Sequence, residues 1–286
     1  MPDPAPLRGP HQLTAPLRFQ ILRVSFEIFA EAPSVRRALR FLIQSAAQPD
    51  PPESTVTYDV RRLADGYEIS RNGEPVDVQF DPRGVLDSMY RRVQHDALGA
   101  WPGVPVLRAL TGRRGPERFA IVGPSLKERS QVGLALLARA VDIEGDDLAI
   151  VHDGGLTAYP RPLRVCGVDV PIPNAAGPRE MLPFVGDNPA TGSWVLDLGQ
   201  AGIDWRVTTG RPDTIILLGT NYGGQTRQSA LPRHQMAQAL MSECDPRGNP
   251  IGAVRAVAEL ASRAKHCLRV WLGSLEHVDS IWPRST

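Results

Sequence analysis

The segment FAIVGPSLKERSQVGLALLARAVDIEGDDLAIV, residues 119–151, contains the pattern on which the fold of this chain depends. An apolar run at 119–122 predicts a buried strand, and Gly123 with the proline after it predicts a turn. The next residues have helical spacing, and 143–151 is predicted to form another apolar strand, containing Asp146 and Asp147. A strand, a glycine turn, a helix and a second strand in this order are typical of a phosphate-binding α/β unit.

The turn and the start of the helix, GPSLKERS at 123–130, can be compared with the phosphate-loop pattern G-x-x-x-x-G-K-[ST]. Gly123 and Ser130 fit the pattern, but Glu128 stands at the second glycine and Arg129 at the lysine. A carboxylate ~4 Å from a phosphate would repel it by roughly 4 kcal/mol at an effective dielectric near 20. Arg129 keeps the positive charge in a wider, planar group, and Lys127 could compensate if the loop folds differently.

Composition places the chain among ordinary globular proteins and excludes several classes of function. It has 286 residues, 42% of them hydrophobic and 22% charged, which is enough for one large domain or two smaller ones. The net charge of +1 favours neither nucleic acid nor a membrane surface as a partner, and no apolar run is long enough for a membrane span. Three cysteines without a C-x-x-C pair, and a proline-containing start without an apolar stretch, predict a cytoplasmic protein without a disulfide framework.

Three regions are expected along the chain: a flexible N-terminus at 1–17, an N-terminal α+β domain at 18–103, and a P-loop domain at 104–286. The N-terminal domain is predicted to contain a strand at 19–29, a helix at 34–47, a hairpin around Asn72-Gly73 and a helix from 81. The second domain is predicted to contain strands at 104–110 and 118–123, the unit described above, and further strands. Helical patterns at 231–244 and 249–273 are expected to close it.

Several of these segments, taken together, resemble one known family. They are GPSLKERSQVGLALLAR at 123–139, IEGDDLAIV at 143–151, TAYPRPL at 157–163 and the closing segment ELASRAKHCLRVWLGSLEHVDSIW at 259–282. In order and spacing the chain resembles the HPr serine kinase/phosphorylase-like proteins, particularly the HPr-kinase-related group encoded beside peptide-natural-product genes. The resemblance spans most of the chain and is strongest from about 104 to 163.

The resemblance implies an α/β fold with a PEP-carboxykinase-like P-loop kinase core and a smaller N-terminal α+β domain. It implies ATP-dependent phosphoryl transfer, with Mg²⁺, to a Ser or Thr hydroxyl of a small protein or precursor peptide. Asp146 would activate the hydroxyl, Ser130 and Asp147 would contact Mg²⁺, and Arg161 would contact the substrate. The residues expected to handle the ATP phosphates lie in the loop or at the start of the helix and are Gly123, Ser125, Lys127, Arg129 and Ser130.

Two alternatives to an active kinase remain open at this point. The first is a pseudokinase that keeps the fold and acts as a peptide- or partner-binding protein in a peptide-modification pathway. The second is a site for another anion, such as a sugar phosphate or carboxylate, at the same helix N-terminus. The resemblance is also compatible with assembly into a homo-oligomer.

Overall fold

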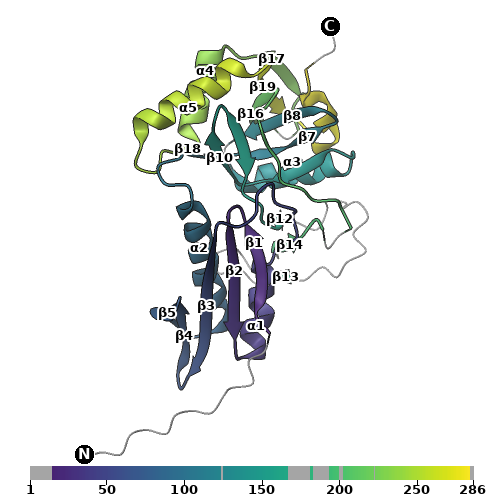
Figure 1. The fold of residues 1–286 in the computed structure, drawn as a ribbon. Helices are drawn as coiled ribbons and strands as arrows, with labels where there is room; N and C mark the ends of the chain where they lie inside the picture. The colour runs from purple at the N-terminus through teal and green to yellow at the C-terminus, as the bar shows by residue number, and fades with distance from the viewer. Residues whose placement is uncertain are drawn as a thin grey trace, which may run out of the picture.

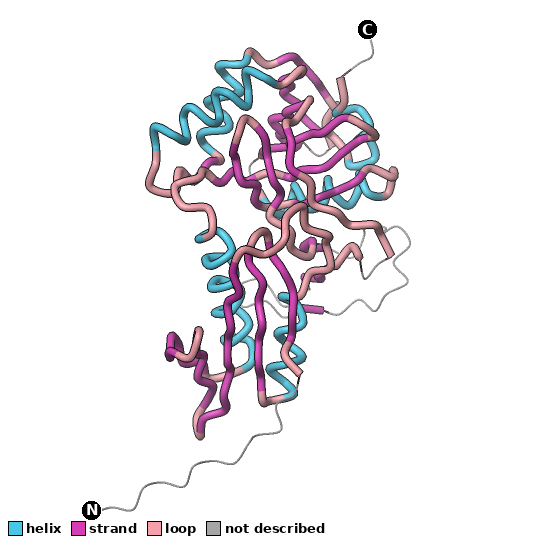
Figure 2. Tube along the Cα trace, in the orientation of Figure 1, coloured by secondary structure: helices cyan, strands magenta, loops and turns pink. Residues whose placement is uncertain are grey.

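The computed structural model describes residues 15–123, 125–166, 181–182, 193–199, 202–221 and 223–283. Within these ranges the chain is a mixed α/β protein (Figures 1 and 2). Figure 1 shows the strands and helices of residues 17–99 in the lower part of the molecule and the two larger sheets of the later residues in the upper part. Most of residues 1–17, which the sequence predicts to be flexible, lie outside the described ranges.

The N-terminal unit contains a sheet with the strand order β1-β2-β3-β4-β5. Its strands are β1 (Leu17–Ile21), β2 (Val24–Ala30), β3 (Ser54–Leu63), β4 (Gly66–Arg71) and β5 (Glu74–Gln79). The prediction of one strand at 19–29 is wrong, because a turn at Leu22, with φ of 54°, separates two antiparallel strands. The hairpin around Asn72-Gly73 is confirmed, since both residues have the positive φ, 50° and 87°, that this tight turn requires.

Two helices pack on this sheet: α1 (Pro33–Leu39), continued by the short 3-10 helix η1 (Arg40–Leu42), and α2 (Pro82–Gly99). The start of α2 agrees with the prediction, because the Asp81 carboxylate accepts hydrogen bonds from the backbone N–H groups at 83 and 84. The first helix is shorter than predicted. Beyond it the chain is extended, and Ala47 forms backbone hydrogen bonds with Trp205 and Val207, at 3.0 and 2.9 Å. This long-range pairing overrides the helical spacing at 43–47.

The central sheet of the second unit has the strand order β17-β19-β16-β8-β7-β9. Its strands are β7 (Leu110–Arg114), β8 (Glu117–Val122), β9 (Asp142–Gly145), β16 (Thr214–Thr220), β17 (Arg227–Ala230) and β19 (His266–Leu272). The helical pattern predicted at 249–273 is wrong in its second half, because β19 pairs in parallel with β16. In β19, Val270 and Leu272 are buried and Arg269 and Trp271 are exposed, which is the period of a strand.

A second sheet, with the order β15-β11-β10-β6-β18, lies against the first. Its strands are β6 (Val106–Arg108), β10 (Leu148–His152), β11 (Gly155–Ala158), β15 (Thr209–Gly210) and β18 (Cys244–Asp245). The single strands predicted at 104–110 and 143–151 are therefore wrong, since each divides between the two sheets, at Ala109 and at Asp146-Asp147. The two crossings are adjacent, because the Ala109 N–H donates to the Asp147 carbonyl at 2.9 Å. The acidic pair thus lies where paired strands bend from one sheet to the other.

Strand β8 shows why the pattern in the opening segment is so apolar. Phe119 and Ile121 belong to the core beneath α3 (Leu126–Leu137) and the 3-10 helix η3 (Leu275–Ile281). Ala120 and Val122 belong to the core beneath α4 (Arg233–Ser242), α5 (Pro250–Arg263) and the second sheet. Both faces of β8 are covered, as in a central parallel strand.

A small third sheet has the order β12-β14-β13, with β12 (Leu163–Cys166), β13 (Met181–Leu182) and β14 (Ser193–Leu196). Among the helices of the described ranges, none combines the length and the apolar character needed to cross a membrane.

Candidate functional site

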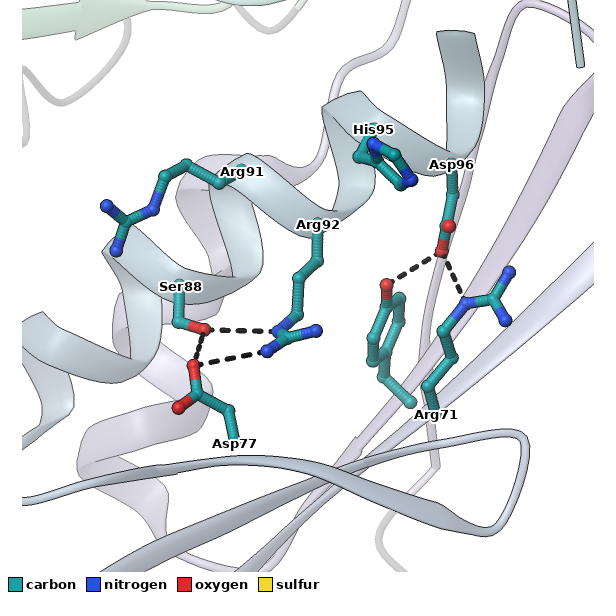
Figure 3. Close-up of a pocket in the computed structure, with 8 residues that line it drawn as sticks. Arg71, Asp77, Ser88, Arg91, Arg92, His95 and Asp96 are labelled. Atoms are coloured by element: carbon teal, nitrogen blue, oxygen red, sulfur yellow. Dashed lines mark hydrogen bonds and ion pairs between the residues drawn. The ribbon is translucent and has the colours of Figure 1, made fainter. Parts of the chain in front are cut away.

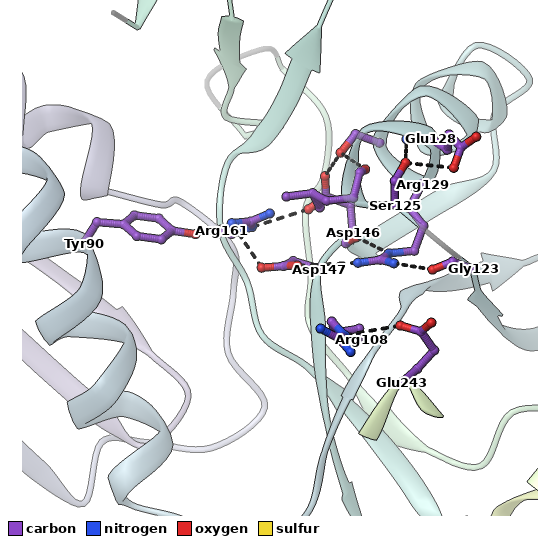
Figure 4. A network of polar contacts seen from close by, with 12 residues as sticks. Tyr90, Arg108, Gly123, Ser125, Glu128, Arg129, Asp146, Asp147, Arg161 and Glu243 are labelled. Atoms are coloured by element: carbon purple, nitrogen blue, oxygen red, sulfur yellow. Dashed lines mark hydrogen bonds and ion pairs between the residues drawn. The ribbon is translucent and has the colours of Figure 1, made fainter. Parts of the chain in front are cut away.

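The site begins where β8 ends and α3 starts (Figure 4). Gly123 follows β8 directly, and a Cβ there would lie 3.0 Å from the Leu218 carbonyl oxygen of β16, so the position has little room for a side chain. Ser125 is the N-cap of α3, and its hydroxyl accepts a hydrogen bond from the Glu128 backbone N–H at 3.1 Å. The same hydroxyl lies 2.8 Å from Glu128 Oε2, to which it donates. Ser125 and Glu128 therefore cap the helix together, in a variant of the capping box.

The carboxylate of Glu128 is held from a second direction as well. Its Oε1 accepts a hydrogen bond from the hydroxyl of Thr220, at the end of β16. The N-terminus of α3 carries partial positive charge, which an anion in the first turn stabilises. Here the chain supplies that anion itself, at the place where a phosphate-binding loop would receive a phosphate.

Arg129 points into the protein, away from the open end of the helix. It is 2% exposed, and its Nη1 donates to the Gly123 carbonyl at 2.8 Å. Its Nε donates to the Asp146 carbonyl at 3.2 Å, and its Nη2 lies 3.6 Å from Asp147 Oδ1. Burial lowers the pKa of Arg129, and the nearby carboxylates, first Asp147, act in the opposite direction. The guanidinium thus ties the loop to the crossing between β9 and β10.

Asp146 lies at the centre of this network and is fully buried. One carboxylate oxygen accepts a hydrogen bond from the Ser130 hydroxyl, and the other lies 3.6 Å from Arg161 Nε. Burial raises the pKa of Asp146, although Arg161 and the Ser130 hydroxyl favour the ionised form. A general base must reach its substrate directly or through a water, and in this arrangement the Asp146 carboxylate contacts Ser130 and Arg161.

Arg161 joins this network to the N-terminal unit. Its side chain is 6% exposed, and its Nη1 lies 3.1 Å from Asp147 Oδ2 and also donates to the Tyr90 hydroxyl of α2. Burial would lower the pKa of Arg161, but Tyr90, Asp147 and Asp146 outweigh it and raise the pKa above its usual value. Figure 4 shows Tyr90, Arg161, Asp147 and Arg129 as a row that runs from α2 to the turn at Gly123.

The four charged side chains in the network balance one another. Arg129 and Arg161 face Asp146 and Asp147, and the largest exposed fraction among the four side chains is 16%, for Asp147. Buried ions are stable only when they are paired and hydrogen-bonded, and each of these four has an opposite charge nearby. Hydrogen bonding within the cluster is incomplete, because Asp146 Oδ1, Arg161 Nε and Arg161 Nη2 are buried without a hydrogen-bond partner among the described residues.

The structure brings together most of the residues that the sequence selects. Gly123, Arg129, Ser130, Asp146, Asp147 and Arg161 lie in one connected network, and Ser125 lies beside it with Glu128. Lys127 is exposed on the first turn of α3 and is not in the network. The residues of the network contact one another.

A Mg-ATP complex fits this arrangement poorly. The Ser130 hydroxyl, which would be the Mg²⁺ ligand, bonds to Asp146 and to the Leu126 carbonyl, the latter at 2.9 Å. Asp147 is engaged by two arginines, and Glu128 covers the helix N-terminus. Across the parts of the chain that the structure describes, no group of three or more His, Cys, Asp or Glu side chains is arranged to hold a metal ion.

Sequence reasoning missed three members of the site. Glu128 was considered only as an obstacle to phosphate, although Ser125 and Glu128 have the S-x-x-E spacing that predicts a capping box. Thr220 and Tyr90 lie 92 and 71 residues from their partners in the chain, and no local pattern identifies them.

Two comparisons with known proteins do not identify a family for this chain. No protein-family model matches the chain, and no curated protein is significantly similar to it.

Proposed function

We propose that this protein is an HPr-kinase-like pseudokinase, in which the phosphate-loop region has become a structural element and the fold acts as a binding protein for a peptide or small protein. The observation that carries the proposal is that two residues of the loop region, Glu128 and Arg129, already have partners within the protein. Glu128 caps the helix N-terminus, and Arg129, in place of the lysine, is buried against Gly123 and Asp147.

Energetics support this assignment. A phosphate at the start of α3 would have to displace Glu128 from the Ser125 and Thr220 hydroxyls, or accept a repulsion of roughly 4 kcal/mol at ~4 Å. A micromolar nucleotide affinity amounts to about 8 kcal/mol, so this penalty would remove about half of it. Arg129 could contribute only by leaving its buried contacts, and Asp147 would then lose one of its two cations.

The direct test is nucleotide binding to the full-length protein, measured by calorimetry and thermal shift with Mg-ATP at millimolar concentration. The wild-type protein should show neither heat nor stabilisation. The variant Glu128→Gln is the matched control, because glutamine keeps the helix cap and removes only the charge. A triple variant, Leu126→Gly with Glu128→Gly and Arg129→Lys, restores the phosphate-loop pattern and should gain stabilisation by nucleotide. Clear binding of Mg-ATP by the wild-type protein would contradict the proposal.

One observation favours a second candidate, an active kinase of the same family. The acidic pair contacts the loop segment directly, through Ser130 to Asp146 and Arg129 to Asp147, as a phosphoryl-transfer site would require after rearrangement. This candidate predicts transfer of the ATP γ-phosphoryl group to a Ser or Thr hydroxyl of a peptide. Mass spectrometry of the peptide would detect the product, which Asp146→Asn should abolish.

A further inference from the structure

An open groove of about 710 Å³ lies in the N-terminal unit, between α2 and the β4–β5 hairpin (Figure 3). It is separate from the network around Asp146. Tyr58 of β3, which is fully buried, is one of the residues that line it. The other lining residues are all polar or charged and are Arg71, Asp77, Ser88, Arg91, Arg92, His95 and Asp96.

The charges in the groove favour an anionic ligand. Asp96 accepts hydrogen bonds from the Tyr58 hydroxyl at 2.7 Å and from Arg71 Nε at 2.9 Å. Asp77 accepts a hydrogen bond from Ser88 and lies 3.4 Å from Arg92 Nη2. Both carboxylates are therefore already engaged.

Two arginines of the groove, Arg71 and Arg91, have N–H groups that remain available to a ligand. Arg71 contacts Asp96 through Nε, its side chain is 41% exposed, and its Nη groups are available to a ligand. The Arg91 side chain is 70% exposed and pairs only at the surface, with Asp87. A ligand carboxylate in the groove would meet the Arg71 guanidinium, which Asp96 holds in place, and the exposed guanidinium of Arg91.

One side of the groove is bounded by β5, which contributes Asp77 to the lining. In the described part of the chain, β5 pairs with β4 alone. The Val76 carbonyl accepts a hydrogen bond from Arg92 Nη2 at 2.7 Å, and the Val78 N–H donates to Asp77 Oδ1 at 2.9 Å. Side chains thus occupy the backbone groups that a neighbouring strand would pair with.

Apolar side chains continue this edge. Outside the groove lining, Val78 of β5 is 51% exposed and Phe80, just after β5, is 81% exposed. An extended chain along β5 would therefore add apolar contacts to its main-chain contacts. A small anion would use only the arginines. The combination of edge, apolar side chains and arginines fits a peptide better than a single phosphate or carboxylate.

We infer that the groove between α2 and β5 binds an extended acidic peptide segment, whose backbone adds to β5 as a further strand. On binding, Arg92 leaves the Val76 carbonyl and pairs with a peptide carboxylate, and Arg71 and Arg91 pair with others. The inference rests on the proposed function, because it names the place and the chemistry by which such a protein would hold a peptide. Exchange of side-chain for main-chain hydrogen bonds is nearly neutral, so charge and apolar contact supply the affinity.

The test uses the full-length protein and a fluorescein-labelled octapeptide of alternating glutamate and valine, with binding measured by fluorescence anisotropy. A lysine–valine peptide of the same length tests charge, and a glutamate–valine peptide with N-methylated alternate residues tests strand addition. The glutamate peptide should bind at low salt and weaken as salt rises, and both other peptides should bind at least about tenfold more weakly.

Protein variants locate the site. Arg91→Glu should weaken binding about tenfold or more. Its matched control is Arg61→Glu, because Arg61 of β3 is also an exposed arginine paired with an aspartate, with a 60% exposed side chain, and does not line the groove. Val78→Pro removes the edge N–H without removing a bond to β4, because that N–H donates to Asp77, and it should also weaken binding. If Val78→Pro fails to fold, the N-methylated peptide carries this part of the test.

Equal binding of the acidic and basic peptides, equal effects of Arg91→Glu and Arg61→Glu, or no binding at all would overturn the inference. So would self-association of the chain that Val78→Pro abolishes, since the occupant would then be a second copy. Displacement of the peptide by single-stranded DNA, with tighter binding of the DNA, would also overturn it. Mg-ATP titration in the same samples separates the two proposals: nucleotide binding with intact peptide binding refutes the pseudokinase alone.

Discussion

The substitution Arg129→Met distinguishes a structural arginine from one that handles phosphates. Methionine is long enough to fill most of the buried space and carries no charge. Arg129 donates to the Gly123 and Asp146 carbonyls at 2.8 and 3.2 Å and lies 3.6 Å from Asp147. If the residue is structural, the substitution should lower the free energy of unfolding. If it handles phosphates, the main effect should be on ligand binding.

The size of the loss follows from these contacts. Two hydrogen bonds from a charged donor contribute about 1.5–3 kcal/mol each, and removal of one partner from a buried ion pair typically costs about 3–5 kcal/mol. These figures describe overlapping effects and are not added. Burial of the guanidinium has its own cost, as the lowered pKa of Arg129 indicates, and methionine avoids it. We therefore expect a loss near 3 kcal/mol, a large part of the roughly 5–15 kcal/mol that stabilises an ordinary domain.

The assay is urea unfolding followed by circular dichroism and tryptophan fluorescence, with coincident transitions required for a two-state analysis. Arg108→Met is the control, because its side chain is 58% exposed and pairs with Glu243 at 3.2 Å, so it should cost less than about 1 kcal/mol. The double variant Arg129→Met with Asp147→Asn should recover part of the loss, since Asp147→Asn removes the excess negative charge that Arg161 alone does not balance. Equal effects of the Arg129 and Arg108 substitutions would refute the structural role.

Three further predictions concern the same network and the N-terminal hairpin. Tyr90→Phe removes the hydroxyl that accepts from Arg161 and should lower the free energy of unfolding by about 1.5–3 kcal/mol in the same urea assay, and an unchanged midpoint would contradict this. Burial raises the pKa of Asp146 above 3.8, so its contribution to stability is fully present below about pH 3.8 and is lost as pH rises through the folded-state pKa. The loss of stability in Asp146→Asn should accordingly shrink as pH rises in that window, and a difference that grows would show that the shift has the opposite sign. Gly73→Ala places a side chain at φ of 87°, with no atom within 4 Å of the new Cβ, and should cost about 1 kcal/mol through backbone strain alone, which a thermal melt would detect.

Local patterns in the sequence were sufficient where neighbours in the chain decide the conformation. The hairpin at Asn72-Gly73 depends on two residues that tolerate positive φ, and the start of α2 depends on one aspartate side chain. The order of strand, turn and helix at 119–137 follows from apolar spacing. The same segment also selected most residues of the candidate site, because those residues are grouped in the chain.

Predictions from local patterns were wrong where one apolar run is divided between two sheets. The runs at 104–110 and 143–151 read as single strands, but each crosses between sheets, since both sheets bury the same kinds of side chain. The helical reading of 249–273 failed for a related reason, because parallel pairing with β16 fixes His266–Leu272 as a strand. Non-local hydrogen bonding decides such segments, and a short apolar run does not encode it.

The sequence by itself determined that a strand–turn–helix unit with an altered phosphate loop is followed by an acidic pair and an arginine. Only the tertiary structure decided which way those groups face. Arg129 turns inward because the Gly123 carbonyl and Asp147 lie behind it, and Glu128 caps α3 because Ser125 and Thr220 hold it there. The physical reason is that a buried charge takes its direction from the partners that compensate it. In this chain some of those partners are near in the sequence, as Gly123 and Ser125 are, but Thr220 of β16 lies 92 residues from Glu128.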